Sequence, residues 1–219
     1  MNSQRWCTLI LALSLLITPI HGTQAQARPV GYDTDTSVAI LYVDRSATGS
    51  NQGTSWANAF TNLQSALDGA SAGDQIWVAQ GVYTPTNTIG RTATFSLKAG
   101  VSLYGGFDPA SGVDVWSERD WQAHVTALSG DLDGNDIPDA NGVITRTNNI
   151  IGNNAYHVLS SSNLTETARL DGFYVTGGKA DGVTMDNRLG GGMFNRPASR
   201  PSLVNVTFSG NLARNYSQW

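Results

Sequence analysis

One sequence pattern occurs twice between residues 170 and 213, at a spacing of 33 residues. Residues 170–180 read LDGFYVTGGKA and residues 203–213 read LVNVTFSGNLA, so a leucine, two apolar positions, a hydroxyl, a glycine and an alanine recur in register. A fixed period of this length indicates stacked repeats, because one unit buries its apolar face only against a neighbour. The repeat therefore restricts the chain to folds that are built from similar layers.

The repeated segments have the period of strands. Apolar residues occupy every second position in the second copy, so we expect Val204, Val206 and Phe208 to face one side and the polar residues between them to face the other. Asn195 and Asn211 end two of the expected strands, and we expect their side-chain amides to bond between layers.

Short strands separated by Gly and Asn turns are compatible with a sandwich, a propeller or a β-helix. We favour an all-β fold, a right-handed parallel β-helix, because each repeat holds several short strands and no tight Asn-Gly hairpin. Further strands are expected where apolar residues alternate between turns, at residues 38–43, 75–79, 92–97, 101–104, 125–128 and 156–159.

One segment has helical spacing instead. Four apolar residues fall on one helical face: Trp56, Phe60, Leu63 and Leu67. Thr54 or Ser55 is the expected N-cap, and Gly69 lies close to the expected end. Because the first coil of a solenoid needs a cover, we interpret this segment as an N-terminal α-helical cap.

Two short motifs carry a resemblance to a known family. Residues 208–211 read FSGN and residues 191–194 read GGMF, and they resemble the FxxN and GGA(I/L) repeats of the chlamydial polymorphic outer membrane proteins. More broadly, the chain from about Tyr42 onward is similar to the N-terminal part of secreted bacterial right-handed β-helix repeat proteins with a pectate-lyase-like fold. In enzymes of that fold, a carboxylate cluster holds calcium against an anionic sugar, and an Arg or Lys acts as the base.

The chain is expected to divide into three parts. Residues 1–27 are predicted to be a secretory signal peptide, with Arg5 before an apolar run at residues 7–20 and a small-residue cleavage site after it. Residues 28–37 are interpreted as a flexible lead-in, and residues 38–219 as the β-helix domain. We therefore expect a protein that is secreted or lies on the outer cell surface, with no transmembrane segment in the mature chain. Its 13 Lys and Arg residues are scattered, which argues against a nucleic-acid partner.

The pattern after Asn211 calls for another glycine-led strand, but residues 212–219 read LARNYSQW. We expect a β-helix that is truncated at its C-terminus. The alternative is a minimal cap, in which Tyr216 and Trp219 fold over the last coil. An open final coil would leave an unpaired strand edge, which predicts self-association there.

Two long insertions, residues 108–124 and 131–154, interrupt the strand pattern. Excursions from a solenoid often gather on one flank and carry the binding surface. We therefore expect the function of the chain to reside in these two insertions.

The second insertion contains DLDGNDIPD at residues 131–139, which is similar to the calcium loops of thrombospondin type 3 modules. Its oxygens follow the ligand order that calcium prefers, with a main-chain carbonyl at the isoleucine: Asp131, Asp133, Asn135, Ile137 and Asp139. Asp136 and Gly142 depart from the EF-hand, which has a glycine and a bidentate carboxylate at these positions. Calcium is the one cofactor that the sequence predicts, and the alternative is a solvated turn rich in Asx residues.

The first insertion contains Trp116 and Trp121 beside carboxylates and a histidine. Flat rings that stack on a pyranose, with polar groups that bind its hydroxyls, are typical of a glycan-binding surface. The alternative is that both tryptophans staple the insertion onto the solenoid. Asp120 with His124, or Glu118 with Asp120, would be the acid/base pairs of a glycoside hydrolase, but sequence spacing does not fix their separation.

The expected strands carry few outward charges. Lys98 lies near a strand end, and Asp171 has Val204 as its counterpart in the second copy. Asp171 is either a catalytic residue or a corner residue that is hydrogen-bonded to the backbone.

Taken together, these features favour an exported, adhesin-like or structural β-helix module. It would bind an extracellular glycan or another cell-surface partner without catalysis. The alternative is a calcium-assisted polysaccharide lyase or glycoside hydrolase. A spacer or a non-functional truncated product is a third interpretation, because this fold hosts several functions.

Overall fold

The computed structural model describes residues 38–86 and 88–214. The predicted signal peptide at residues 1–27, the lead-in at residues 28–37, and Tyr216 and Trp219 lie outside the described residues. Within the described part, no helix combines the length and the apolar character that a membrane crossing requires.

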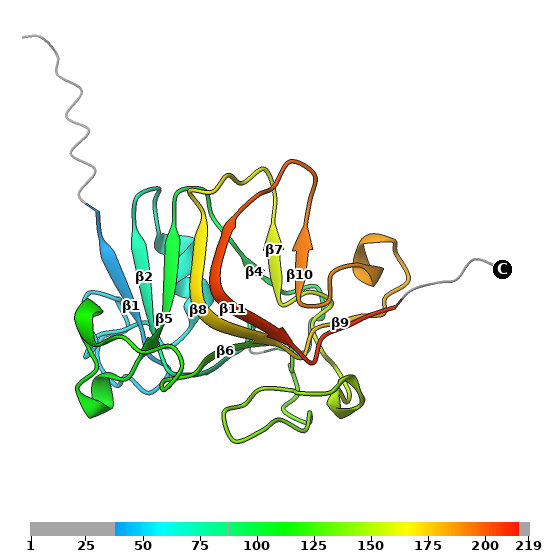
Figure 1. Cartoon of the computed structure of the whole chain (residues 1–219), viewed down its shortest axis with the longest axis horizontal. Coiled ribbons are helices and arrows are strands. Elements are labelled where there is room, and N and C mark those ends of the chain that lie inside the picture. Colours follow the sequence, from blue (N-terminus) through cyan, green and yellow to red (C-terminus); the bar gives the residue numbers. More distant parts are fainter. Residues whose placement is uncertain (1–37, 87, 215–219) are drawn as a thin grey trace, which may run out of the picture. The chain divides into compact units, whose positions relative to one another are not determined.

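The described chain is built mainly from parallel strands, shown in Figure 1. The largest sheet runs in the order β1-β2-β5-β8-β6-β3, and β11 pairs with β8. Its strands are β1 Ile40–Val43, β2 Gln75–Ala79, β3 Gly81–Tyr83, β5 Ser102–Phe107, β6 Thr126–Ser129, β8 Arg169–Thr176 and β11 Ser202–Ser209. A second sheet has the order β10-β7-β4, and a third pairs β12 with β9. Their strands are β4 Phe95–Ser96, β7 Leu159–Ser161, β9 Lys179–Ala180, β10 Met193–Asn195 and β12 Leu212–Ala213.

The 33-residue repeat is confirmed as a stack of parallel strands. Leu203 of β11 lies opposite Leu170 of β8, and Leu212 of β12 lies opposite Lys179 of β9. The expected bonds between layers are also present at the strand ends. The Asn211 amide accepts a hydrogen bond from Gly178 N at 3.0 Å and donates one to the Val175 carbonyl at 2.7 Å.

The alternation predicted for the second copy is interrupted. Gly172 and Asn205 occupy the same level of their strands, and both have left-handed backbone, with φ of 79° and 51°. This left-handed residue shifts the side-chain alternation within each strand. Leu203 lies opposite the buried Leu170, and Val204 lies opposite Asp171. The expectation that Val204 shares a face with Val206 was wrong for this reason.

The core lies inside the curved sheet. Aligned positions of successive strands supply it: Leu41, Ile76, Leu103 and Leu170 stand opposite one another, and Leu103 and Leu170 are fully buried. Each fully buried aliphatic side chain contributes about 1.5–3 kcal/mol relative to an exposed one. In the last layer Phe208 is 45% exposed, because the outer edge of β11 has no described partner. Self-association at this edge stays a prediction.

The N-terminal helix is shorter than expected. Helix α1 spans Leu63–Gly69, and Asn62, not Thr54 or Ser55, is its N-cap, accepting a hydrogen bond from Gln64 N at 2.7 Å. Trp56 and Phe60 precede the helix, because Phe60 forms a parallel bridge with Val43. The buried face of α1 contacts the core at the start of the sheet.

The strand predictions were correct in most places and differ in detail. The strand at residues 75–79 is confirmed as β2. β4 is shorter than its predicted segment but lies within it, and β7 is shorter and begins at the last residue of its predicted segment. β3 was missed, because Gly81 was interpreted as a separator, although its φ of 134° lets the chain turn directly into a strand that pairs with β6. In the part of the chain that the structure describes, four short 3-10 helices lie in the connections: η1 Pro109–Ser111, η2 Trp116–Glu118, η3 Thr147–Asn149 and η4 Asp186–Arg188.

Candidate functional site

The outer face of the large sheet carries a column of aromatic rings. Tyr42 of β1, Trp77 of β2 and Tyr104 of β5 lie opposite one another in register. Because successive residues of a strand point to opposite faces, these rings face away from the core that their neighbours supply. Asp171 of β8 continues the same column.

The first insertion docks on this column through more rings. The Trp116 ring meets Tyr104 edge-on, with 4.7 Å between centroids, and lies 5.8 Å from the Trp77 ring. Trp77 in turn stacks on Phe107 at 4.8 Å and an interplanar angle of 9°. Trp56 donates a hydrogen bond from its indole N–H to the Asp114 carbonyl at 2.8 Å, which ties the insertion to the start of the domain.

Trp116 is the exposed member of this cluster. It keeps 48% of its surface accessible, whereas Trp77 keeps 8% and Phe107 none. The staple that the sequence allowed is therefore present, and one ring of the staple also faces solvent. Trp121 makes a different contact, since its main chain crosses Gly106 so closely that an added Cβ would lie 2.5 Å from the Trp121 Cα.

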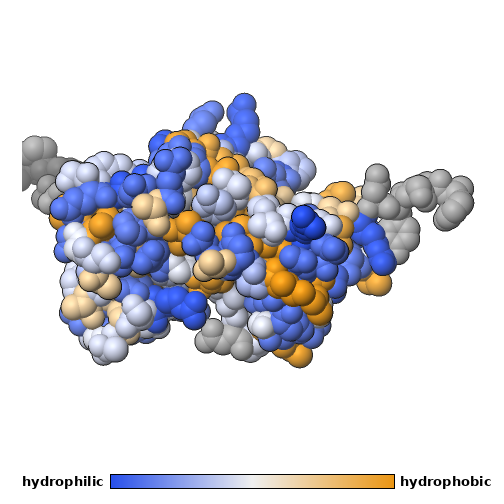
Figure 2. All heavy atoms as spheres, turned by 60° about the horizontal axis from the view of Figure 1, so that its bottom comes forward, coloured by the Kyte–Doolittle hydropathy of each residue, from blue (hydrophilic) through white to orange (hydrophobic). Residues whose placement is uncertain are grey.

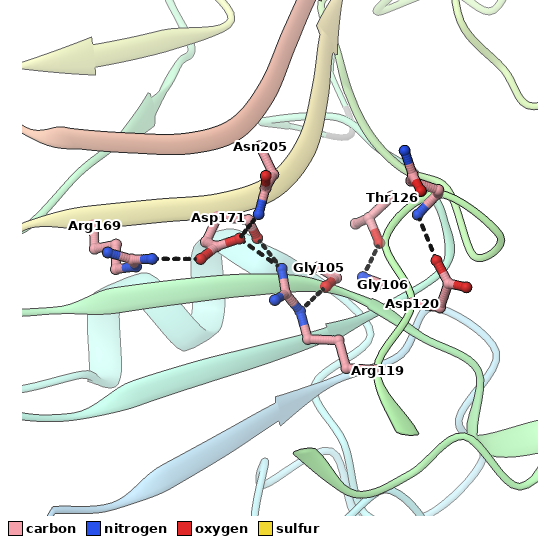
Figure 3. A network of polar contacts seen from close by, with 9 residues as sticks. Gly105, Gly106, Arg119, Asp120, Thr126, Arg169, Asp171 and Asn205 are labelled. Atoms are coloured by element: carbon pink, nitrogen blue, oxygen red, sulfur yellow. Dashed lines mark hydrogen bonds and ion pairs between the residues drawn. The ribbon is translucent and has the colours of Figure 1, made fainter. Parts of the chain in front are cut away.

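Beneath Trp116, Arg119 connects the insertion to the sheet (Figure 3). Its Nε donates to the Gly105 carbonyl at 2.5 Å, and its Nη2 donates to the Asp171 main-chain oxygen and to Asp171 Oδ1, both at 2.9 Å. The guanidinium also lies 5.4 Å from the Trp116 ring centroid and 5.7 Å from that of Tyr104. Arg119 thus contacts both the exposed Trp116 ring and the buried Asp171 carboxylate, and it fixes their relative positions.

Asp171 is saturated by donors. Besides Arg119, its carboxylate accepts hydrogen bonds from Arg169 Nη2 at 2.7 Å and Asn205 Nδ2 at 3.1 Å (Figure 3). Burial alone would raise the pKa of Asp171, but these donors outweigh it and hold the pKa below the usual range. The carboxylate therefore stays charged and bonded, which suits a positioning role and not that of a base. It is not a corner residue bound to backbone, as one interpretation of the sequence had it.

Asp120 and His124, which the sequence suggested as an acid/base pair, have other side-chain contacts. Asp120 Oδ1 accepts main-chain hydrogen bonds from Gln122 at 3.0 Å and Ala123 at 3.1 Å. The bonds from Ala123 and Gln122 lower the pKa of Asp120. His124 Nδ1 lies 3.6 Å from Asp108 Oδ2. In this geometry Asp120 closes a turn.

The carboxylates of the predicted calcium loop bind main-chain N–H groups. Asp131 Oδ1 accepts from Gly134 N at 2.8 Å, Asp133 Oδ2 from Asn153 N at 3.0 Å, and Asp139 Oδ1 from Asn141 N and Val143 N, both at 2.9 Å. The bonds at Asp131 and Asp139 are those of local Asx turns, whereas the bond at Asp133 joins the two ends of the insertion. Among residues 38–86 and 88–214, no group of three or more His, Cys, Asp or Glu side chains is placed to hold a metal ion. Calcium at Asn135, Ile137 and the three aspartates stays a prediction.

Asp136 is the anchor of this insertion, and the sequence indicated it only as a departure from the EF-hand. Asp136 is 8% exposed, and its carboxylate accepts hydrogen bonds from Ile151 N at 2.5 Å and Asn154 Nδ2 at 2.6 Å. The fully buried Asn154 also donates to the Gly177 carbonyl at 2.7 Å, which joins the loop to the turn after β8. Burial is the main cause that raises the pKa of Asp136, against the hydrogen bonds from Ile151 and Asn154.

The site therefore consists of an exposed indole on a rigid base with a charged strip beside it. We define the Trp116 platform as Tyr104, Trp116, Arg119, Arg169 and Asp171. The sequence indicated Trp116 and Asp171 but missed Tyr104, Arg119 and Arg169. The alignment of equivalent outward positions in successive strands is the signal that would have found Tyr104 and Arg169.

No protein-family model, curated protein or solved structure matches the chain. The resemblance to polymorphic outer membrane protein repeats and to pectate-lyase-like proteins consequently stays a prediction, and the function is argued from the geometry.

Proposed function

We propose that this chain is an exported, non-catalytic module of a right-handed parallel β-helix that binds an extracellular glycan at the Trp116 platform. The export signal expected at residues 1–27 supports the location. Parallel pairing of β8 with β11 at a spacing of 33 residues supports the successive coils of a β-helix.

The observation that carries the binding proposal is the exposed Trp116 ring, fixed from below by Tyr104 and Arg119. A ring that is already ordered loses little conformational entropy when a ligand stacks on it. Indole offers a flat apolar surface to the C–H face of a sugar ring and an N–H donor at its edge.

A strip of charged side chains is connected to the ring through Arg119. Arg169 lies opposite Ser102, one strand from Tyr104, and its side chain is 36% exposed. Arg169 is connected to the ring through Asp171 and Arg119: its Nη2 donates to Asp171, which also binds Arg119, and the Arg119 guanidinium lies 5.4 Å from the Trp116 ring centroid. Figure 2, which brings forward the side of the molecule from which both insertions project in Figure 1, shows polar and apolar side chains interleaved on this face.

Catalysis is less well supported than binding. Lyases and hydrolases of anionic polysaccharides need a carboxylate that is available to hold calcium or move a proton. Asp171, the carboxylate of the platform, accepts hydrogen bonds from Arg119, Arg169 and Asn205, and its pKa is lowered.

A glycan array with the purified protein tests the proposal. We expect retention on a subset of polysaccharides, loss of that retention in Trp116→Ala, and no release of reducing or unsaturated ends. Release of reducing or unsaturated ends by the unaltered protein would replace binding by catalysis. Equal retention of Trp116→Ala and the unaltered protein would show that the platform is not the binding surface.

A further inference from the structure

A groove of about 490 Å³ lies against the three-stranded sheet and is distinct from the Trp116 platform. Phe95, Leu159 and Met193 are aligned in β4, β7 and β10, so the residues that follow them, Ser160 of β7 and Phe194 of β10 among them, face the other way. The connection from β9 to β10, which contains η4 Asp186–Arg188, forms the opposite wall. The volume falls within the range of about 300–1,000 Å³ that small-molecule sites occupy.

Hydroxyl groups line much of the groove: Thr92, Thr94, Ser160 and Thr184. Ser160 Oγ lies 3.2 Å from Ser96 Oγ, and Thr94 Oγ1 donates to the Val158 carbonyl at 3.2 Å. Each hydroxyl has one donor and two acceptor positions, so these contacts leave acceptor capacity for a ligand.

An ion pair spans the groove wall. Arg196 Nη2 lies 3.3 Å from Asp186 Oδ2, and the two side chains are 55% and 54% exposed. Exposed pairs of this kind add little to folding stability. A guanidinium has five N–H donors and a carboxylate about four acceptor sites, so one contact leaves most of both groups able to bind ligand hydroxyls.

Phe194 gives the groove a rigid apolar wall. Its ring stacks on His157 with 4.7 Å between centroids and an interplanar angle of 18°, and the Arg196 guanidinium lies 5.3 Å from the same ring. His157 Nδ1 donates to the Gly190 carbonyl at 3.1 Å, which leaves Nε2 as an acceptor on the neutral ring. Burial lowers the pKa of His157 more than the main-chain bonds at Gly190 and Leu189 raise it, which favours the neutral imidazole at pH 7.

The charges of the lining residues cancel. Asp186 contributes one negative charge, Arg196 one positive charge, and His157 none. An anionic ligand would be attracted by Arg196 and repelled by Asp186, and a cationic ligand would be attracted by Asp186 and repelled by Arg196. A neutral ligand rich in hydroxyls can use both groups at once, as acceptor and donor.

We propose that this groove binds a neutral saccharide of one or two sugar rings. Asp186 and Arg196 bind adjacent ring hydroxyls, the Thr94 and Ser160 hydroxyls bind a further one, and Phe194 with Met185 contacts the apolar ring edge. The proposal does not depend on the Trp116 platform, because the two sites share no residue.

Methionine methyl groups report on the groove directly. Met185 lines the groove and is 78% exposed, whereas Met193 packs against the core. In protein labelled with methyl-¹³C methionine, titration with millimolar cellobiose, maltose, lactose and methyl glycosides of glucose, galactose, mannose and N-acetylglucosamine should shift the Met185 resonance saturably with at least one of them. The Met193 resonance should stay in place.

Two variants and two controls decide the outcome. Asp186→Ala and Arg196→Ala should each lower the affinity for the saccharide that binds by about tenfold or more, since each removes several hydrogen bonds. Arg200→Ala, an exposed arginine four residues from Arg196, and Trp116→Ala should leave the affinity within about twofold. If Trp116→Ala no longer binds on the glycan array but still shows the saccharide-dependent shift of Met185, the two sites are independent.

Three results would overturn the proposal. The first is a Met185 resonance that none of the neutral saccharides moves. The second is a glucuronate or galacturonate ligand that binds more tightly than its neutral counterpart. The third is unchanged affinity in both Asp186→Ala and Arg196→Ala.

Discussion

Asp171→Asn should destabilise the fold strongly, because it removes the charge at the centre of the Arg119, Arg169 and Asn205 network. The Asp171 and Arg119 side chains are only 6% and 9% exposed. Removing one partner of a buried ion pair costs about 3–5 kcal/mol, because the other charge stays buried without compensation. Asparagine keeps one acceptor oxygen and Arg169 is partly solvated, so we expect a loss of about 3 kcal/mol in the free energy of unfolding.

Urea unfolding at pH 7 measures this loss, and the chain offers a matched control. Asp186→Asn makes the same substitution in an ion pair with side chains 54–55% exposed, and it should cost less than about 1 kcal/mol. Equal losses in the two variants would refute the assignment of Asp171 as a buried structural charge.

The pH dependence of the free energy of unfolding tests the same prediction independently. Because the Asp171 pKa is lowered from 3.8 in the folded protein, its contribution to stability is present above the unfolded pKa. That contribution is lost as the pH falls through the folded pKa. The stability difference between Asp171→Asn and the unaltered protein should therefore be constant near neutral pH and shrink below about pH 4.

Three further predictions concern other parts of the chain. The pKa of Asp136 is raised in the folded protein, so its contribution to stability is lost as the pH rises through that pKa, above 3.8. Asp136→Asn should therefore flatten the pH dependence of the urea midpoint above about pH 4, and parallel curves for the two proteins would contradict this. Gly172→Ala should lower the free energy of unfolding by about 1–3 kcal/mol, because φ is 79° and the new Cβ would collide with Arg119 Nη2. The control Gly69→Ala, with no atom within 4 Å of its Cβ, should change it by less than about 1 kcal/mol, and equal stability of the two variants would be inconsistent with this backbone. If the loop at residues 131–139 binds calcium, a chelator should lower the melting temperature, and Asp131→Ala with Asp133→Ala should remove that effect; a melt that the chelator leaves unchanged would exclude calcium there.

The sequence was most informative where a pattern repeats. The spacing of Leu170 and Leu203 predicted the parallel stack, because equivalent residues of successive layers must bury the same face. Strand β2 was predicted at its observed bounds because residues 75–79 alternate between clear turns.

Local geometry explains most of the differences. The left-handed residues Gly172 and Asn205 change the side-chain alternation within a strand, and periodicity alone does not show such a turn. Helix α1 starts late because the bridge between Phe60 and Val43 takes up the first apolar positions of the expected helix.

The candidate site could be predicted only in part. The neighbouring residues in the sequence indicated Trp116, but its ring partners Tyr104 and Trp77 lie on strands that the insertion reaches through folding. Composition also favoured calcium in the second insertion, since carboxylates that bind main-chain N–H groups and carboxylates that bind a metal have the same sequence spacing.

The affinity of Trp116→Ala for the glycan that the array identifies tests the central claim most directly, measured by calorimetry beside the unaltered protein. Phe208→Ala is the matched control, because Phe208 is 45% exposed and Trp116 is 48% exposed. The account predicts a loss of about tenfold or more for Trp116→Ala, equivalent to about 1.4 kcal/mol, and less than about twofold for Phe208→Ala. Equal affinities for all three proteins would contradict it.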